Sequence, residues 1–261
     1  MYHTSILRKA KKTFVLLLVG ISMWGCEKPT GSVTPLAWSP QKPEDSKVFR
    51  IFQETNFQFI GIKSATDQSL VTNPGYRLIT KWYNTDTVTI FVDTRSYLYI
   101  SLLSKTQTIL DEFNELVERP YFKLTNEDQA NVSIFRSDAD VFQKYYQVRP
   151  EVERGFVGYV FYGNNSLFDA YALNSNGKAK LWLSDTYIVY FDRLLRHELG
   201  HVLGLNHTKD TNSFMFPIAI AGYPNQLAPF DQKVIQILYD PRIKVGVKYE
   251  DCEPVLKDLL K

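Results

Sequence analysis

The chain has 261 residues, of which 44% are hydrophobic and 22% are charged, a composition typical of a folded globular protein and not of a disordered one. Its formal net charge is only +2, and no long basic run follows residue 12, so the charge pattern does not favour nucleic acid as a partner. The length is sufficient for one sizeable catalytic domain with an N-terminal addition.

The first 25 residues have the pattern of an export signal. Basic residues at 8–12 precede an apolar run at 14–24 that is too short to span a bilayer comfortably. The residues that end this run, Gly25 and Cys26 among them, resemble the lipobox of bacterial lipoproteins. The resemblance implies that Cys26 becomes a lipidated N-terminus, which would anchor the protein to a cell-envelope membrane, facing the periplasm or the exterior. Ordinary secretion and a buried helix of the fold are the alternatives.

The next fifty residues are predicted to connect this leader to the main domain. Residues 26–45 contain four prolines and few consecutive apolar residues, which favours a tether. Residues 46–78 include β-like runs at 48–52 and 57–62, together with turn signals. This segment is therefore interpreted as a small β appendage, a pro-segment or the first strands of the main domain. The second of the two cysteines is Cys252, so a fold held by disulfides is not expected.

A catalytic domain with an α/β (α+β) fold and a mixed sheet is predicted over residues 79–245, followed by a tail at 246–261. Strands interleaved with one early helix, and then two late helices, indicate this class. Apolar residues at helical spacing make the early helix long and amphipathic. The expected strands are 88–92, 121–124, 131–135, 155–162 and 179–183, and the expected helices are 97–117, 188–203 and 229–239.

Three of the four histidines fall within eleven consecutive residues: His197, His201 and His207. His197 and His201 are four residues apart, which places both imidazoles on one side of a helix, one turn apart. A glycine at 204 permits the left-handed backbone that ends a helix, and the chain can then bring His207 back to the same metal. Three neutral imidazoles with an open fourth position are expected of catalytic zinc rather than structural zinc.

Glu198 is the predicted catalytic base. At helical geometry its side chain projects about 100° round from His197, near enough to reach an activated water without binding the metal. Zinc would lower the pKa of water and polarise a carbonyl, and Glu198 would move the proton from the water to the leaving amine. The alternatives are a surface-anchored binding lipoprotein with a vestigial zinc site, and a zinc hydrolase that acts on a non-peptide bond.

The eleven-residue run HELGHVLGLNH from His197 to His207 resembles the zinc signature of the metzincin endopeptidases. Residues 213–217 resemble their Met-turn, which implies that Met215 lies beneath the zinc as an apolar floor. Asp231 with 235–239 is similar to the final helix of the matrixins, which implies that Asp231 is buried and supports the Met-turn; a charge at a helix N-terminus is its alternative role. The resemblance implies a metzincin-like fold and cleavage of a peptide or protein substrate.

The same resemblance implies a substrate pocket walled by the segment after the Met-turn. Its predicted lining includes Pro217, Ile218 and Tyr223, whose apolar character predicts a preference for a hydrophobic residue just after the scissile bond. Pro217 stands where some related families have a zinc-binding tyrosine, so a fifth ligand is not expected. The stretch 163–178 could hold Ca²⁺, although its Asn and Gly residues are more often plain turn residues.

Overall fold

The computed structural model describes residues 40–62, 70–73, 78–83, 85–147, 158–162, 172–173, 178–185, 191–217 and 226–261. The predicted export signal, Cys26 and most of the predicted tether lie outside these residues. Within them, no helix is both long enough and apolar enough to cross a membrane.

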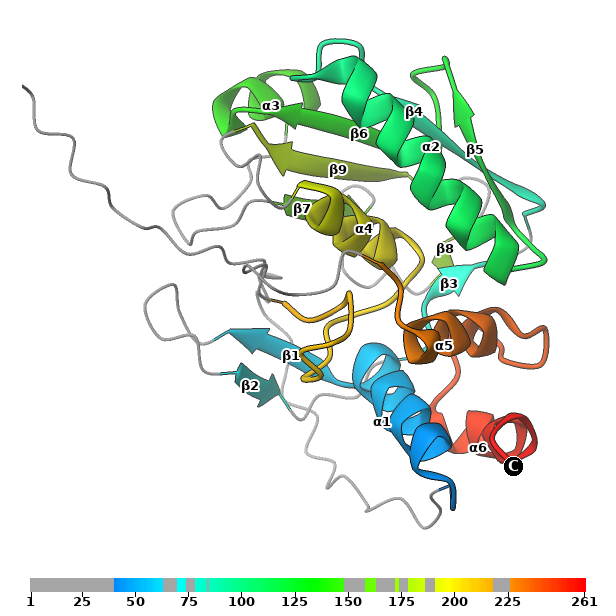
Figure 1. Ribbon diagram of the computed structural model, residues 1–261. Helices are drawn as coiled ribbons and strands as arrows, with labels where there is room; N and C mark the ends of the chain where they lie inside the picture. Colours follow the sequence, from blue (N-terminus) through cyan, green and yellow to red (C-terminus); the bar gives the residue numbers. More distant parts are fainter. Residues whose placement is uncertain are drawn as a thin grey trace, which may run out of the picture.

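A five-stranded sheet forms one layer of the molecule (Figure 1). Four of its strands run parallel, and the fifth pairs antiparallel with its neighbour at one edge, so the predicted mixed sheet is confirmed. In the strand at 87–92 the buried residues alternate with more exposed ones, the pattern of a strand whose one face meets a core. In sheet order the strands are β5 (Tyr121–Thr125), β4 (Thr87–Val92), β6 (Val132–Ser137), β9 (Ala179–Ser184) and β7 (Gly158–Tyr162).

Helices cover both faces of this sheet. Successive residues of a strand point to opposite faces, so Ile134 and Phe135 of β6 separate two apolar clusters. Ile134 belongs to the main core, which also contains the buried side chains of α2 (Tyr99–Leu116) and α4 (Phe191–Val202). Phe135 packs with α3 (Ala139–Tyr146), whose first turn is capped by the Asp138 carboxylate.

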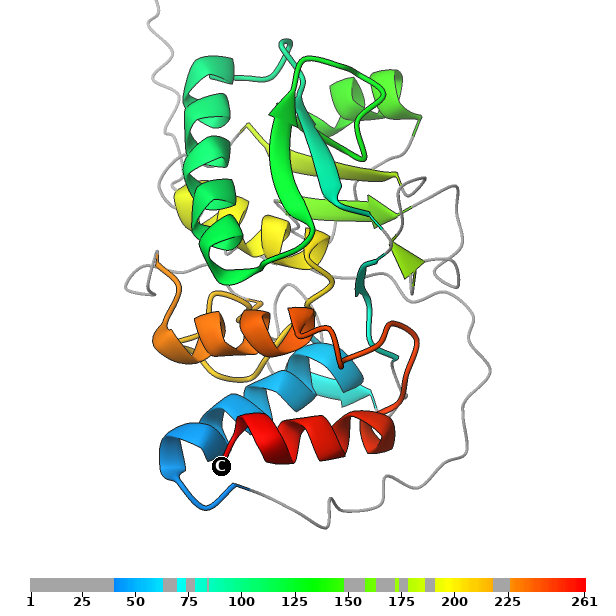
Figure 2. The same ribbon diagram turned by 90° about the vertical axis from the view of Figure 1, so that its right-hand side faces the viewer.

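Three further helices form a second layer beneath α4 (Figure 2). These are α1 (Pro43–Phe57), α5 (Pro229–Tyr239) and α6 (Tyr249–Leu259). Edge-to-face contacts of Tyr249 with Phe49 (6.1 Å between ring centroids) and Phe57 (5.7 Å) join α6 to α1. Two small sheets complete the fold: antiparallel β1 (Phe59–Ile62) with β2 (Leu70–Asn73), and parallel β3 (Lys81–Trp82) with β8 (Ala172–Leu173).

The predicted β-like run at 48–52 is wrong, because these residues lie within α1. Pro43 in the first helical turn, followed by Glu44 and Asp45, is a favourable helix start. The apolar residues of α1 are buried on more than one side, so in sequence they form an almost continuous run that resembles a strand. The helix also begins before residue 45, so the predicted end of the tether falls inside it. The run at 57–62 does contain a strand, β1.

Most of the predicted C-terminal tail at 246–261 forms α6. Its buried residues Tyr249, Cys252 and Leu256 are spaced three and four apart, which is the spacing of one helix face. The other predicted helices and strands are confirmed over the described residues, whereas α3, β2, β3 and β8 were not predicted.

Candidate metal centre

Three histidines meet where α4 ends and the chain turns back. His197 and His201 lie one turn apart on α4, and His207 returns from the loop that follows. One ring nitrogen from each lies within 4.8 Å of the others, and all three side chains are buried. The ring centroids are 4.8–5.2 Å apart, so the imidazoles surround a common point.

Each imidazole is oriented by a backbone carbonyl group. The Nδ1 atoms of His197, His201 and His207 each lie 2.8 Å from a carbonyl oxygen, that of Phe214, Leu205 and Ile60 respectively. A carbonyl can only accept, so each Nδ1 carries the proton and donates it, and each Nε2 presents a lone pair. Metal-binding histidines commonly donate their other N–H in this way, which fixes both tautomer and ring orientation.

These residues fit a zinc ion. The three Nε2 atoms are buried, and within the described part of the chain that of His197 has no hydrogen-bond partner. Burial, followed by the neighbouring His201 and His207, lowers the pKa of His197 well below its ordinary value, so this imidazole stays neutral. Three imidazole nitrogens are a donor set that suits Zn²⁺.

Glu198 lies beside the histidines and is completely buried. Among the residues that the structure describes, neither of its carboxyl oxygens has a hydrogen-bond partner, and burial raises its pKa well above the usual range. An unpartnered buried carboxyl group costs free energy, so its presence requires an explanation other than folding. Such groups concentrate at functional sites.

The turn from α4 to His207 requires glycine at position 204. Gly204 has φ +104°, and a Cβ atom there would lie 2.0 Å from the carbonyl oxygen of Thr80. Its N–H donates to the carbonyl of His201 (2.8 Å), which closes the last turn. The predicted end of the helix is therefore confirmed, with a close backbone approach as a second reason for glycine.

Two side chains from distant elements satisfy carbonyl groups at this helix end. Trp82 Nε1 donates to the Val202 carbonyl (2.8 Å), and the Tyr239 hydroxyl donates to the Leu203 carbonyl (2.9 Å). The final carbonyls of a helix have no partner within the helix, so these bonds stabilise the turn. Neither residue was identified as part of the site from sequence, because each acts through a contact with a residue that is distant in the chain.

The turn at 213–217 packs directly against the histidine helix. Met215 is completely buried, and a Cβ atom on Gly200 would lie 2.4 Å from its sulfur. Glycine between the two helical histidines therefore allows this close approach. The Thr208 N–H donates to the Met215 carbonyl (3.2 Å), so the turn is also joined to the loop that carries His207.

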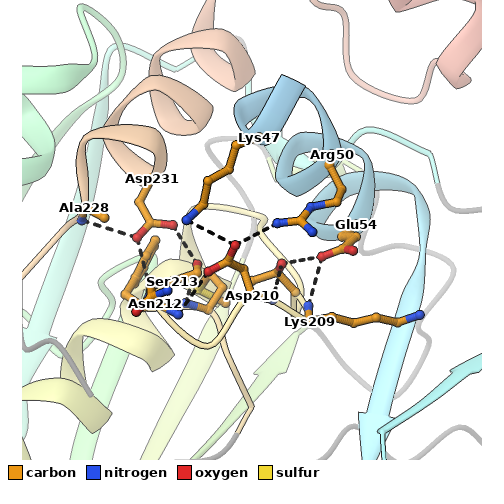
Figure 3. A network of polar contacts seen from close by, with 12 residues as sticks. Lys47, Arg50, Glu54, Lys209, Asp210, Asn212, Ser213, Ala228 and Asp231 are labelled. Carbon is orange, nitrogen blue, oxygen red and sulfur yellow. Dashed lines mark hydrogen bonds and ion pairs between the residues drawn. The ribbon is translucent and has the colours of Figure 1, made fainter. Parts of the chain in front are cut away.

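Asp231 binds both this turn and the start of α5 (Figure 3). Its Oδ1 accepts from the Ser213 hydroxyl (2.6 Å), and its Oδ2 accepts from the N–H groups of Phe214 (3.2 Å) and Ala228 (3.3 Å). Both roles considered from the sequence are thus present. Burial raises the pKa of Asp231 to about 6.

A second polar network joins α1 to residues 206–210 (Figure 3). Glu54 accepts hydrogen bonds from the Thr208 hydroxyl and from the Lys209 N–H. Sequence reasoning missed this connection, since 46–78 was interpreted as a β appendage, a pro-segment or the first strands of the main domain, with no contact to the histidine loop predicted. The available signal was a glutamate that closely follows the apolar residues Ile51 and Phe52.

Several predicted positions lie outside the described residues. They are Ile218 and Tyr223 of the substrate pocket, and Asn164, Asn165, Asp169 and Asn174 of the candidate calcium stretch. Pro217 is described and is buried two residues after Met215.

Fold and site together define a class. A mixed sheet, a helix that carries His-Glu-x-x-His, a third histidine beyond a glycine turn and a buried methionine turn are the features of a metzincin. Residues 121–240 match the family model described as Matrixin. Stromelysin-3 of Rattus norvegicus and stromelysin-3 of Mus musculus are each 49% identical over 43 residues, which is 16% of this chain and 9% of each relative. Residues 121–240 are therefore similar to a matrixin domain, and the chain aligns with less than a tenth of these relatives' length.

Proposed function

We propose that the chain is a zinc-dependent endopeptidase that hydrolyses peptide bonds in a peptide or protein substrate. The observation that carries this proposal is the arrangement of three imidazoles, each with its Nδ1 bound to a carbonyl and its Nε2 buried. Beside them lies Glu198, whose carboxyl oxygens have no hydrogen-bond partner among the described residues. The matrixin match supports it.

In this proposal His197, His201 and His207 hold the zinc through Nε2. When bound, zinc supplies Lewis-acid activation of water and polarises the scissile carbonyl. Glu198 takes the proton from the attacking water and delivers it to the leaving amine. The carbonyl groups of Phe214, Leu205 and Ile60 accept the Nδ1 protons and so orient the imidazoles, and Met215 closes the apolar side of the site.

We also propose a preference for a hydrophobic residue just after the scissile bond. The segment after the Met-turn begins at the buried Pro217, and Leu227 packs against the core at its other end. Ile218 and Tyr223 between them supply apolar side chains.

We further propose that the protein works outside the cytoplasm and is anchored by a lipid on Cys26. Labelled palmitate should be incorporated into the wild type but not into Cys26→Ser.

The test is cleavage of a peptide library by the purified full chain, with and without a chelator. We expect cleavage that the chelator abolishes and added zinc restores. Glu198→Ala should still bind one zinc but lose about 10²–10⁴-fold in kcat/KM, the usual contribution of general acid–base catalysis. Glu115→Ala, which removes an exposed glutamate from α2, is the matched control and should cleave normally. Equal cleavage by wild type and Glu198→Ala would sink the mechanism, and zinc binding without any cleavage would favour a binding protein.

A further inference from the structure

One face of α1 is directed at the loop that carries His207. Lys47, Arg50 and Glu54 are spaced three and four residues apart, so they share one side of the helix. Lys47 Nζ and Arg50 Nη2 lie 3.2 and 2.8 Å from the Asp210 carboxylate, whose side chain is only 9% exposed. Two cations on α1 thus face the acidic end of the loop (Figure 3).

Glu54 holds the residues that immediately follow His207. It is 7% exposed, and its Oε2 accepts from the Thr208 hydroxyl and from the Lys209 N–H (2.9 Å). On the other side of the histidine, the Asn206 N–H donates to the Thr55 carbonyl (2.8 Å). The backbone before and after His207 is therefore bound to α1.

The imidazole of His207 is bound by the same segment. Ile60 lies in β1, three residues beyond the last residue of α1, and its carbonyl accepts the Nδ1–H at 2.8 Å. This contact spans 147 residues of sequence. Backbone position and ring orientation of the third histidine thus both depend on residues 54–60.

We propose that residues 43–62 are a permanent part of the metal centre, in which Glu54 is a positioning residue for His207 and the Ile60 carbonyl orients its ring. The identity of the bound ion rests on the proposed function. A segment that supplies these bonds cannot be removed on activation without disturbing a ligand. It is therefore retained in the active protein and is not a pro-segment that is discarded.

The test compares the zinc affinity of Glu54→Ala and Glu54→Gln in the full chain, measured by competition with a chelating indicator. Glu54→Ala should weaken zinc binding about 10–100-fold, the usual effect of losing a group that supports a metal ligand. Glu54→Gln should stay within a few-fold of wild type, because one amide oxygen at the Oε2 position can accept from both donors.

The control is Val48→Ala, which removes buried volume from a different face of α1. It should lower the Tm of the zinc-free protein and leave zinc affinity unchanged well below that Tm. The proposal is overturned if Glu54→Ala binds zinc like wild type, or if Val48→Ala loses as much affinity.

Mass spectrometry of the active species provides a second measurement. Retention of residues 43–62 is expected, and an active species that lacks them with full zinc affinity would contradict the proposal. Zinc affinity is measured without a substrate. A protein that binds zinc but cuts no peptide would therefore refute the proposed function, while the role of Glu54 would still be decided by the affinity measurements.

Discussion

The three histidines of the candidate metal centre are oriented by two different parts of the molecule. The carbonyl group that accepts from His197 lies 17 residues away in sequence, and the one that accepts from His201 lies 4 residues away. The carbonyl group that accepts from His207 lies 147 residues away. The two helical histidines, His197 and His201, are thus oriented by the segment that follows them, whereas His207 is oriented by the N-terminal segment. A compact motif can therefore supply all the ligands of a site and only part of what orients them.

The largest effect is expected at Gly204, where the chain leaves α4 and turns toward His207. Gly204→Ala forces a residue with a Cβ into φ +104° and against the Thr80 carbonyl. Left-handed strain and overpacking each cost about 1–3 kcal/mol, so we expect a loss of about 4 kcal/mol in the free energy of unfolding. Chemical denaturation of the zinc-free protein measures it.

Gly246→Ala is the matched control for this substitution. Gly246 also has a positive φ (+72°), but a Cβ atom there meets nothing within 4 Å. Its cost should be about 1 kcal/mol, from strain alone. Equal losses for the two variants would show that the approach of Thr80 contributes nothing.

Asp231 tests the local support, because it holds the turn whose Phe214 carbonyl binds His197. Burial raises its pKa from 3.8 to about 6, so between these values the folded protein binds more protons than the unfolded chain. Stability contributed by this group is therefore complete below pH 4 and is lost as pH rises through 6. Relative to Asp231→Asn, which does not titrate, the free energy of unfolding of wild type should fall by up to about 3 kcal/mol over this range. Parallel stability curves for the two proteins would contradict the assignment.

Arg50 tests the remote support and should have the smallest effect. Its side chain is 57% exposed, and it shares Asp210 with Lys47. Exposed ion pairs contribute about 0–1 kcal/mol, so Arg50→Ala should change the free energy of unfolding by about 0.5 kcal/mol or less. Urea denaturation in low and high salt measures this, and a loss comparable to that of Gly204→Ala would mean that the α1 contact is far stronger than its exposure indicates.

The local half of the site could be predicted from the sequence, and the remote half could not. The spacing of His197 and His201 follows from helix geometry, and a glycine before a third histidine indicates a turn, so chemistry and backbone limit these positions to a few residue types. The helices at 97–117, 188–203 and 229–239 were likewise predicted from the sequence, with apolar periodicity as the main signal. The mixed sheet was predicted from the order of strands and helices.

The role of residues 54–60 in positioning His207 could not be predicted from the sequence, and the reason is physical. Ile60 contributes a backbone carbonyl, a group that every residue possesses, so its identity carries no signal of its function. Glu54 is recognisable only once 43–57 is known to be a helix, and the apolar run at 48–52 within this helix resembles a strand. The same applies to Thr80, whose carbonyl limits Gly204 from across the fold.

X-ray absorption at the zinc edge of the purified, zinc-loaded full chain tests the central claim most directly. The three-histidine centre predicts three imidazole nitrogens at about 2.0–2.1 Å, one further light atom and no sulfur. His207→Ala should reduce the imidazole count to two. A sulfur shell near 2.3 Å, or fewer than three imidazoles in the wild type, would contradict the account.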